Sequence, residues 1–128
     1  MRLLLDTHAF LWWLAGDPSL PERARQVIAE EGNIVSLSAA SAWEIAIKVR
    51  LGKLPGAATI AGDILGCLQA EGFEPLAVTV RHGQHAGALP GLHRDPFDRM
   101  LIAQAILEGC VLVSNESRFD AYGVIRLW

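Results

Sequence analysis

The sequence is poor in cysteine, in excess basic charge and in long apolar runs. Its two cysteines, Cys67 and Cys110, lie far apart and form none of the Cys/His spacings of zinc sites, so we expect reduced core residues. Eleven basic residues against 14 acidic ones give a net charge of −3. This balance excludes a general positive field for nucleic acid, but it leaves room for a local basic groove.

We also expect neither a leader nor a membrane span in this sequence. The apolar run within residues 1–16 is similar to a signal peptide, but Asp6 and His8 interrupt it and it is too short to cross a bilayer. We therefore expect a cytoplasmic protein without membrane association. The 128 residues, 52% of them hydrophobic, suffice for one domain over residues 1–128 with a substantial core.

Short apolar runs alternate with amphipathic stretches along the whole sequence. Strands are predicted at residues 2–5, 33–37, 74–78, 111–113 and 124–127, and helices at residues 7–15, 21–31, 38–51, 60–71, 80–89 and from 96 to near 109. This alternation predicts an α/β fold, with a parallel sheet, helices on both faces and right-handed crossovers.

The last long helix carries an acid where an apolar residue is expected. Asp95 suits the N-cap and Pro96 the first helical position. Asp98, however, shares a face with Leu101 and Ile102. A carboxylate on a buried face needs a hydrogen bond, a cation or a metal ion. The alternative is that Asp98 only supports the cap, near the positive end of the helix dipole.

Five carboxylates are predicted to meet at one edge of the sheet. Asp6 and Glu116 follow strands, whereas Glu44, Asp95 and Asp98 lie in the first turns of helices that begin at that edge. Ligands of such sheets bind outside the carboxyl ends of the strands. Several of these acids have alternative interpretations as helix caps: Asp6 could be a simple N-cap, and Glu44 could belong to a capping box. Independent caps need not share one edge, however, and crowded oxygen ligands suit Mg²⁺ or Mn²⁺.

Two pairs of residues are less informative. His82 and His85 stand three apart, but no third ligand supports a zinc site, so we expect surface histidines. Trp12 and Trp13 cannot both face the same side as the apolar residues around them. We therefore expect one of these two indoles to be exposed or to lie at an interface.

Four groups of residues stand in a characteristic order: Leu3–Thr7, then Ser38 with Trp43–Ile45, then Asp95–Arg99 with Leu101–Ala103, and last Leu112–Ser114 with Glu116 and Phe119. Their order and spacing resemble the PIN-domain nucleases, in particular the toxin ribonucleases of bacterial VapBC toxin–antitoxin modules. The resemblance covers essentially the whole chain. No single motif is specific, but the four together are.

The resemblance implies a metal-dependent endoribonuclease that acts as the toxin of a type II toxin–antitoxin system. The first three catalytic, metal-binding acids of the family fall on Asp6, Glu44 and Asp98. The fourth, usually an aspartate, falls on Glu116, whose side chain is one methylene longer. Asp95 resembles an additional acid found in one branch of the family, and we include it among the candidate metal ligands.

The resemblance further implies a Mg²⁺ or Mn²⁺ cofactor, an RNA substrate, inhibition by a small VapB-like antitoxin and a homodimer. Candidates for contacts with phosphate or RNA are the basic residues near the acids and two hydroxyls: Lys48, His93, Arg94, Arg99, Ser38 and Ser114. Surface solvation remains the alternative for the basic residues.

Three other functions remain open. A nuclease of the same fold in RNA maturation or DNA processing would carry the same acids, because this chemistry does not need the 2′-hydroxyl. A response-regulator receiver is disfavoured, since Asp6 is single and the third strand ends without an acid. A metal-binding interaction domain without catalysis would differ only in its lack of turnover.

Overall fold

The computed structural model describes residues 1–91 and 94–128, and a five-stranded parallel sheet forms its centre. The strands lie in the order β3-β2-β1-β4-β5. Their bounds are β1 (Arg2–Leu5), β2 (Ile34–Ser38), β3 (Glu74–Leu76), β4 (Val111–Val113) and β5 (Arg126–Leu127). The chain builds outward from β1 in one direction and later in the other, so the strand order reverses between β1 and β4. The predicted fold class is confirmed.

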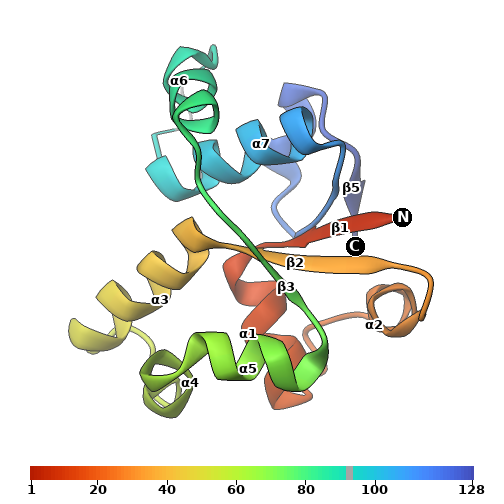
Figure 1. Cartoon of the computed structure of the whole chain (residues 1–128), viewed down its shortest axis with the longest axis vertical. Helices are drawn as coiled ribbons and strands as arrows, with labels where there is room; N and C mark the ends of the chain where they lie inside the picture. Colours follow the sequence, from red (N-terminus) through yellow and green to blue (C-terminus); the bar gives the residue numbers. More distant parts are fainter. Residues whose placement is uncertain (92–93) are drawn as a thin grey trace.

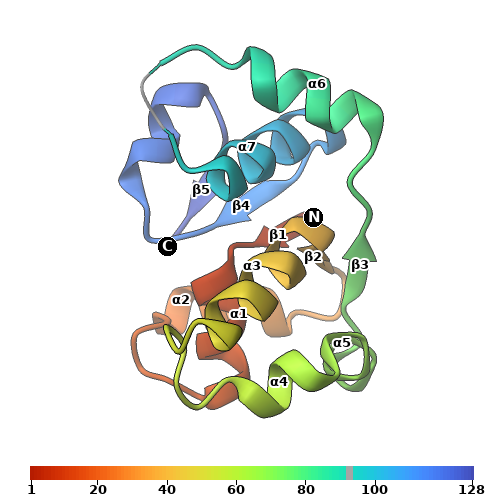
Figure 2. The same cartoon turned by 90° about the vertical axis from the view of Figure 1, so that its left-hand side faces the viewer.

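Helices cover both faces of this sheet (Figures 1 and 2). On one side lie α1 (Thr7–Ala15), α2 (Glu22–Ala29), α4 (Ala58–Gly62) and α5 (Ile64–Glu71). On the other lie α7 (Pro96–Glu108) and, beyond it, α6 (Val80–Ala88). The remaining helix α3 (Ala39–Arg50) follows β2, and the 3-10 helix η1 (Ser117–Tyr122) follows β4. No helix among the described residues is long and apolar enough to cross a membrane.

The central strand β1 shows why the sheet needs two covering layers. Leu3 and Leu5 pack into one core with Phe10 of α1, whereas Leu4 packs into a second core with Leu101 of α7. All three leucines are completely buried. A strand sends successive side chains to opposite faces, so an unbroken apolar run is what a doubly covered parallel strand requires.

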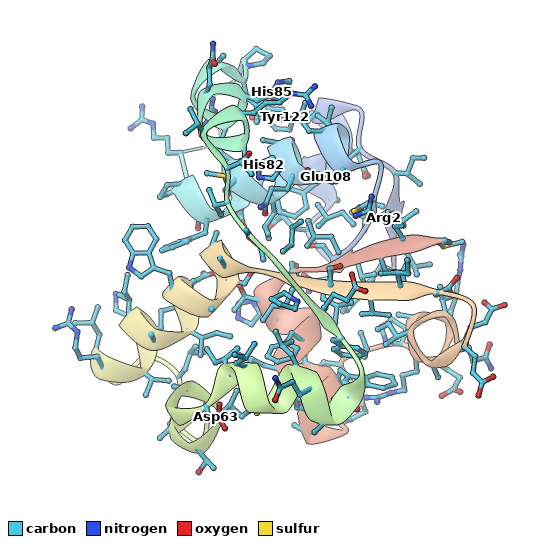
Figure 3. The ribbon with its side chains drawn as sticks, in the orientation of Figure 1. Arg2, Asp63, His82, His85, Glu108 and Tyr122 are labelled. Carbon is cyan, nitrogen blue, oxygen red and sulfur yellow. The ribbon has the colours of Figure 1, made fainter. Side chains whose placement is uncertain are left out.

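The predicted helix over residues 60–71 is divided in two. Asp63 adopts a non-helical conformation (φ −156°, ψ 71°), which ends α4, and its carboxylate accepts the amide N–H of Gly66 at 2.9 Å, which starts α5. Figure 3 labels Asp63 at this break. The predicted strand over residues 74–78 is also shorter, because β3 ends at Leu76.

Candidate functional site

A polar cavity of about 200 Å³ opens at the carboxyl edge of the sheet, where β1 and β4 lie side by side. The strand order reverses there, as expected of a ligand site in an open α/β sheet. All five predicted acids line this cavity, together with five further residues: Asp6, Glu44, Asp95, Asp98, Glu116, Thr7, His8, Lys48, Asn115 and Arg118. The predicted convergence of the carboxylates is therefore present in the structure.

Asp6 lies deepest in the site and is only 8% exposed. Its carboxylate caps α1 by accepting the amide N–H of Ala9 at 2.8 Å. Burial raises the pKa of Asp6, and the charge of Glu44 raises it further, against hydrogen bonds from Ser114 and Ala9 and the charge of His8. The ionised form of Asp6 is therefore destabilised, and a nearby cation would stabilise it.

Ser114 joins the ends of β1 and β4. Its fully buried hydroxyl donates to Asp6 and accepts the amide N–H of Glu116 at 3.0 Å. Ser38 is also fully buried, and its hydroxyl caps α3 by accepting the amide N–H of Ala40 at 3.0 Å. Both serines were predicted to contact RNA. The structure corrects this, because neither hydroxyl is accessible and both are bonded within the chain.

Glu44 is buried in the second turn of α3 and has a partner on each oxygen. The Thr7 hydroxyl donates to Oε1 at 2.5 Å, and the Lys48 ammonium lies 2.5 Å from Oε2. Because Ser38 caps the helix and α3 begins at Ala39, Glu44 lies too deep to belong to a capping box. Its carboxylate instead borders the acidic cavity.

The start of α7 carries the other two predicted acids. Asp95 is the N-cap, and its carboxylate accepts the amide N–H groups of Phe97 at 2.9 Å and of Asp98 at 3.2 Å. Asp98 is half-buried in the first turn and lines the same cavity. The cap prediction for Asp95 is thus confirmed.

Glu116 forms a paired contact with Arg118, a residue that the sequence reasoning missed. Arg118 Nε and Nη2 each lie 3.0 Å from one oxygen of the Glu116 carboxylate. The hydrogen bond to Glu116 and then its charge raise the pKa of Arg118, and the charges of Asp98 and Asp95 add to this. Arg118 could have been found from the sequence, because a basic residue stands two positions after an acid that follows a predicted strand.

The donor set fits a hard divalent cation. Among residues 1–91 and 94–128, no three Asp, Glu, His or Cys side chains form a compact ligand cluster. Mg²⁺, however, keeps several of its waters and is commonly held by only one or two carboxylates. Carboxylate oxygens around one small cavity, with a buried Asp6 whose charge is only partly compensated, match this type of binding.

The predicted basic contacts divide into different groups. Lys48 borders the acidic cavity, and Arg94 is exposed beside Asp95. Arg99 turns away, because its guanidinium donates to the carbonyls of Ala86 (3.1 Å) and Leu89 and so ties α7 to the end of α6. This corrects the prediction that Arg99 binds RNA. His93 lies outside the described residues.

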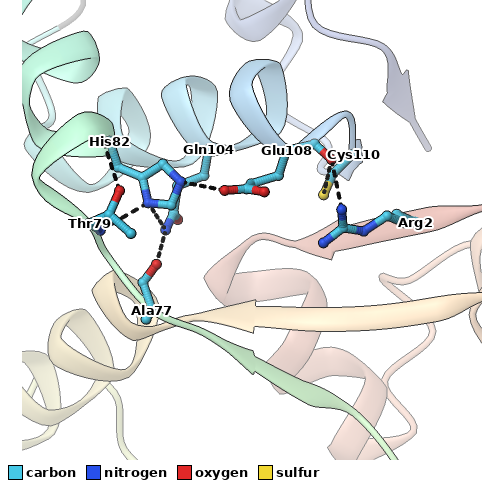
Figure 4. A network of polar contacts seen from close by, with 7 residues as sticks. All are labelled: Arg2, Ala77, Thr79, His82, Gln104, Glu108 and Cys110. Carbon is cyan, nitrogen blue, oxygen red and sulfur yellow. Dashed lines mark hydrogen bonds and ion pairs between the residues drawn. The ribbon is translucent and has the colours of Figure 1, made fainter.

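The expectation of two surface histidines is wrong for His82. This ring is 2% exposed between α6 and α7, bonded to Glu108 and close to Gln104 (Figures 3 and 4). His85 is half-buried. The sequence did not reveal that α6 packs on α7, which supplies these partners from more than 20 positions away.

The expectation for Trp12 and Trp13 also changes, because neither is exposed. Trp12 packs against Trp128 and Trp13 against Phe73, with ring centroids 5.7 and 5.9 Å apart. The exposed tryptophan is Trp43, at 64%.

Comparisons with known proteins agree with this architecture. The family model for the PIN domain matches residues 3–125. Ribonuclease VapC22 of Mycobacterium tuberculosis is 31% identical over 123 residues, which cover 94% of this chain and 91% of the relative. Ribonuclease VapC16 of the same organism is 42% identical over 64 residues, 50% of this chain and 45% of that relative.

A solved structure shows the same fold. VapBC2 from Rickettsia felis, bound to a DNA fragment from their promoter, matches with a TM-score of 0.74 over 99% of this chain and 98% of that one, at 19% identity. The sheet order, the acids at its carboxyl edge and a family match over nearly the whole sequence lead to one assignment: this chain belongs to the PIN-domain family.

Proposed function

We propose that this protein is an endoribonuclease that depends on Mg²⁺ or Mn²⁺ and acts as the toxin of a type II toxin–antitoxin module. The main support is that Asp6, Glu44, Asp98 and Glu116, from four separate segments, line one cavity at the carboxyl edge. Two relatives are named ribonucleases, which supports RNA as the substrate class. A similar fold in a VapBC complex supports a protein partner.

The four acids would hold the cation through their carboxylate oxygens. When bound, a divalent cation lowers the pKa of a bound water and offsets the charge of the reacting phosphate. Asp6 is fixed for this role by Ser114, and Glu44 is fixed by Thr7. Asp98 projects from the rigid first turn of α7. Such orienting hydrogen bonds commonly contribute to metal affinity.

Lys48 and Arg118 would then bind the substrate backbone. In the structure they neutralise Glu44 and Glu116, each through a direct ion pair. A cation between the carboxylates would compete for these acids and leave the two basic side chains free to pair with phosphate oxygens. Arg118 can do so with two parallel N–H bonds, as its contact with Glu116 shows.

The test is cleavage by the purified protein without any antitoxin. We expect it to cut single-stranded RNA with Mg²⁺ or Mn²⁺ and to stop in chelator. A DNA strand of matched sequence tests the alternative substrate. Equal cutting after complete metal removal would contradict the metal dependence, and cleavage of DNA alone would replace RNA as the substrate.

We further infer that the antitoxin covers an aromatic pair beside the acidic cavity, formed by the exposed Trp43 and the half-buried Phe97. Trp43 and Phe97 meet edge to face at 5.3 Å, and each directly precedes one of the acids, Glu44 and Asp98. A partner helix could place an apolar side chain on Trp43 and a basic one in the cavity. This surface replaces Trp12 and Trp13, which pack within the chain.

Growth assays test this inference. Trp43→Ser should keep toxicity but escape suppression by the co-expressed neighbouring gene. Leu65→Ser, at another exposed apolar position on α5, serves as the control and should still be suppressed. Equal suppression of both variants would show that the antitoxin binds a different surface. The proposed homodimer and cytoplasmic location are tested separately, by light scattering of the pure protein and by cell fractionation.

A further inference from the structure

A second cavity, of about 750 Å³, lies beside the acidic one. Seven described residues line it: Pro90, Gly91, Arg94, Asp95, Arg118, Ala121 and Tyr122. They come from the approach to α7 and from η1, which lie next to each other in Figure 2, where η1 is violet-blue. Asp95 and Arg118 border both cavities, so the two cavities are adjacent at this point.

The wall of this second cavity is apolar and includes one aromatic ring. Pro90 and Ala121 contribute aliphatic surface beside the half-buried ring of Tyr122. The Tyr122 hydroxyl lies against the backbone at Gly91, where an added Cβ would stand 2.9 Å from it. Gly91 also has a positive φ of 90°, which other residues rarely adopt. The ring is therefore held against the backbone, in a cavity of the size that small ligands occupy.

Three charged residues line the second cavity: the basic Arg94 and Arg118 and the acidic Asp95. Arg94 is exposed, and Arg118 is 65% exposed while paired with Glu116. An aromatic ring and two arginines around one cavity suit an unstacked base, because RNA-binding proteins stack bases on aromatic rings and on arginine planes. The same guanidinium groups can pair with the phosphates on either side of that base.

We propose that this cavity binds the base of a nucleotide adjacent to the phosphodiester that is cut, and so selects the sequence at the cut. The proposal rests on the proposed nuclease function. Because Asp95 and Arg118 belong to both cavities, a strand with one phosphate at the acids brings its neighbouring nucleoside to the Tyr122 wall.

The first test measures binding without catalysis. The four ribonucleoside monophosphates are titrated into the full chain in chelator and followed by NMR. We expect shifts at Arg94, Ala121 and Tyr122. Ala121 is exposed, so Ala121→Glu should fold, fill the cavity and weaken binding at least about fivefold, given the usual contribution of base stacking. Ala70→Glu, at an exposed position on α5, should bind like the wild type.

The second test reads the sequence at the cut. Fragment ends from a random-sequence RNA should show a base preference beside the cut, and this preference should disappear in Ala121→Glu but persist in Ala70→Glu. Metal-dependent cutting with an unchanged preference in Ala121→Glu, or monophosphate shifts elsewhere on the protein, would overturn the base site and leave the nuclease proposal intact. Shifts at the cavity without any RNA cleavage would instead retain the base site and refute the nuclease proposal.

Discussion

Two polar clusters of this molecule contain acids, but they differ in how far the chain balances the charge of those acids. In the His82 cluster, Nδ1 accepts the amide N–H of Thr79 at 3.0 Å and Nε2 donates to Glu108 at 2.9 Å (Figure 4). Thr79 Oγ1 accepts the His82 amide in return, at 3.1 Å, which completes a capping box at the start of α6. Both ring nitrogens of His82 thus have partners within the chain.

The acidic cavity has no such balance. Five carboxylates line it against two permanently charged basic residues, Lys48 and Arg118. Burial and the neighbouring Glu44 raise the pKa of Asp6. We interpret the histidine–acid pair as a structural link, and we take the excess of negative charge around the cavity, with Asp6 and Glu44 buried, as support for the proposed cation site.

The largest effect should come from removing one charge from the acidic cavity. Asp98→Asn should lower RNA cleavage by at least about 100-fold, because even the residues that orient metal ligands commonly contribute 10- to 100-fold. The metal-free variant should be no less stable than the wild type, since repulsion between carboxylates falls. Cleavage rates at saturating Mg²⁺ and melting curves in chelator measure both effects.

Asp95→Asn is the matched control, because asparagine caps helices about as well as aspartate. Its stability should stay near that of the wild type, whatever happens to its activity. Near-normal cleavage by a folded Asp98→Asn protein would remove Asp98 from the site. Loss of stability with retained cleavage would make it a structural anchor.

The opposite pattern should appear in the His82 cluster. His82→Ala removes the capping box and leaves Glu108 without its histidine, so the free energy of unfolding should fall by about 2–3 kcal/mol. Cleavage per folded molecule should stay within about twofold of the wild type. Denaturant titration measures the first quantity and cleavage of the folded fraction the second. A stable but inactive His82→Ala protein would overturn the contrast between the clusters.

A smaller effect, dependent on pH, should distinguish the two clusters further. The folded chain holds the Asp6 proton more tightly than the unfolded chain, so ionisation of Asp6 destabilises the metal-free fold. Asp6→Asn, which keeps the cap, should therefore melt at a higher temperature than the wild type at pH 7 in chelator. This difference should shrink as the pH falls towards the ordinary value of 3.8. A constant difference at every pH would show that burial of the charge is not its source.

The sequence was sufficient where local pattern decides the structure. The apolar run at Leu3–Leu5 predicted a doubly covered strand, and the acids at strand ends and in first helical turns predicted one edge. It was insufficient where distant partners decide. Burial of His82 depends on Gln104 and Glu108 of another helix.

Local competition also limited the sequence reading. The sequence pattern is helical on both sides of Asp63, but this residue interrupts the helix. Its carboxylate caps the start of α5, and its backbone does not continue α4. Arg118 enters the site only because η1 turns back towards Glu116 after β4. Ser114 was predicted as a contact for phosphate or RNA, and its burial could not be foreseen because it depends on the packing of β4 between β1 and β5.

The most direct measurement is calorimetric titration of Mn²⁺ into chelator-stripped protein, because it tests the cation site without requiring catalysis. Asp98→Asn changes the acidic cavity, and Glu108→Gln changes the acid of the His82 cluster in the same way. We predict that the wild type and Glu108→Gln bind Mn²⁺ equally, whereas Asp98→Asn binds roughly tenfold more weakly or worse. Equal affinity in all three proteins would contradict the assignment of the carboxyl-edge acids as the cation site.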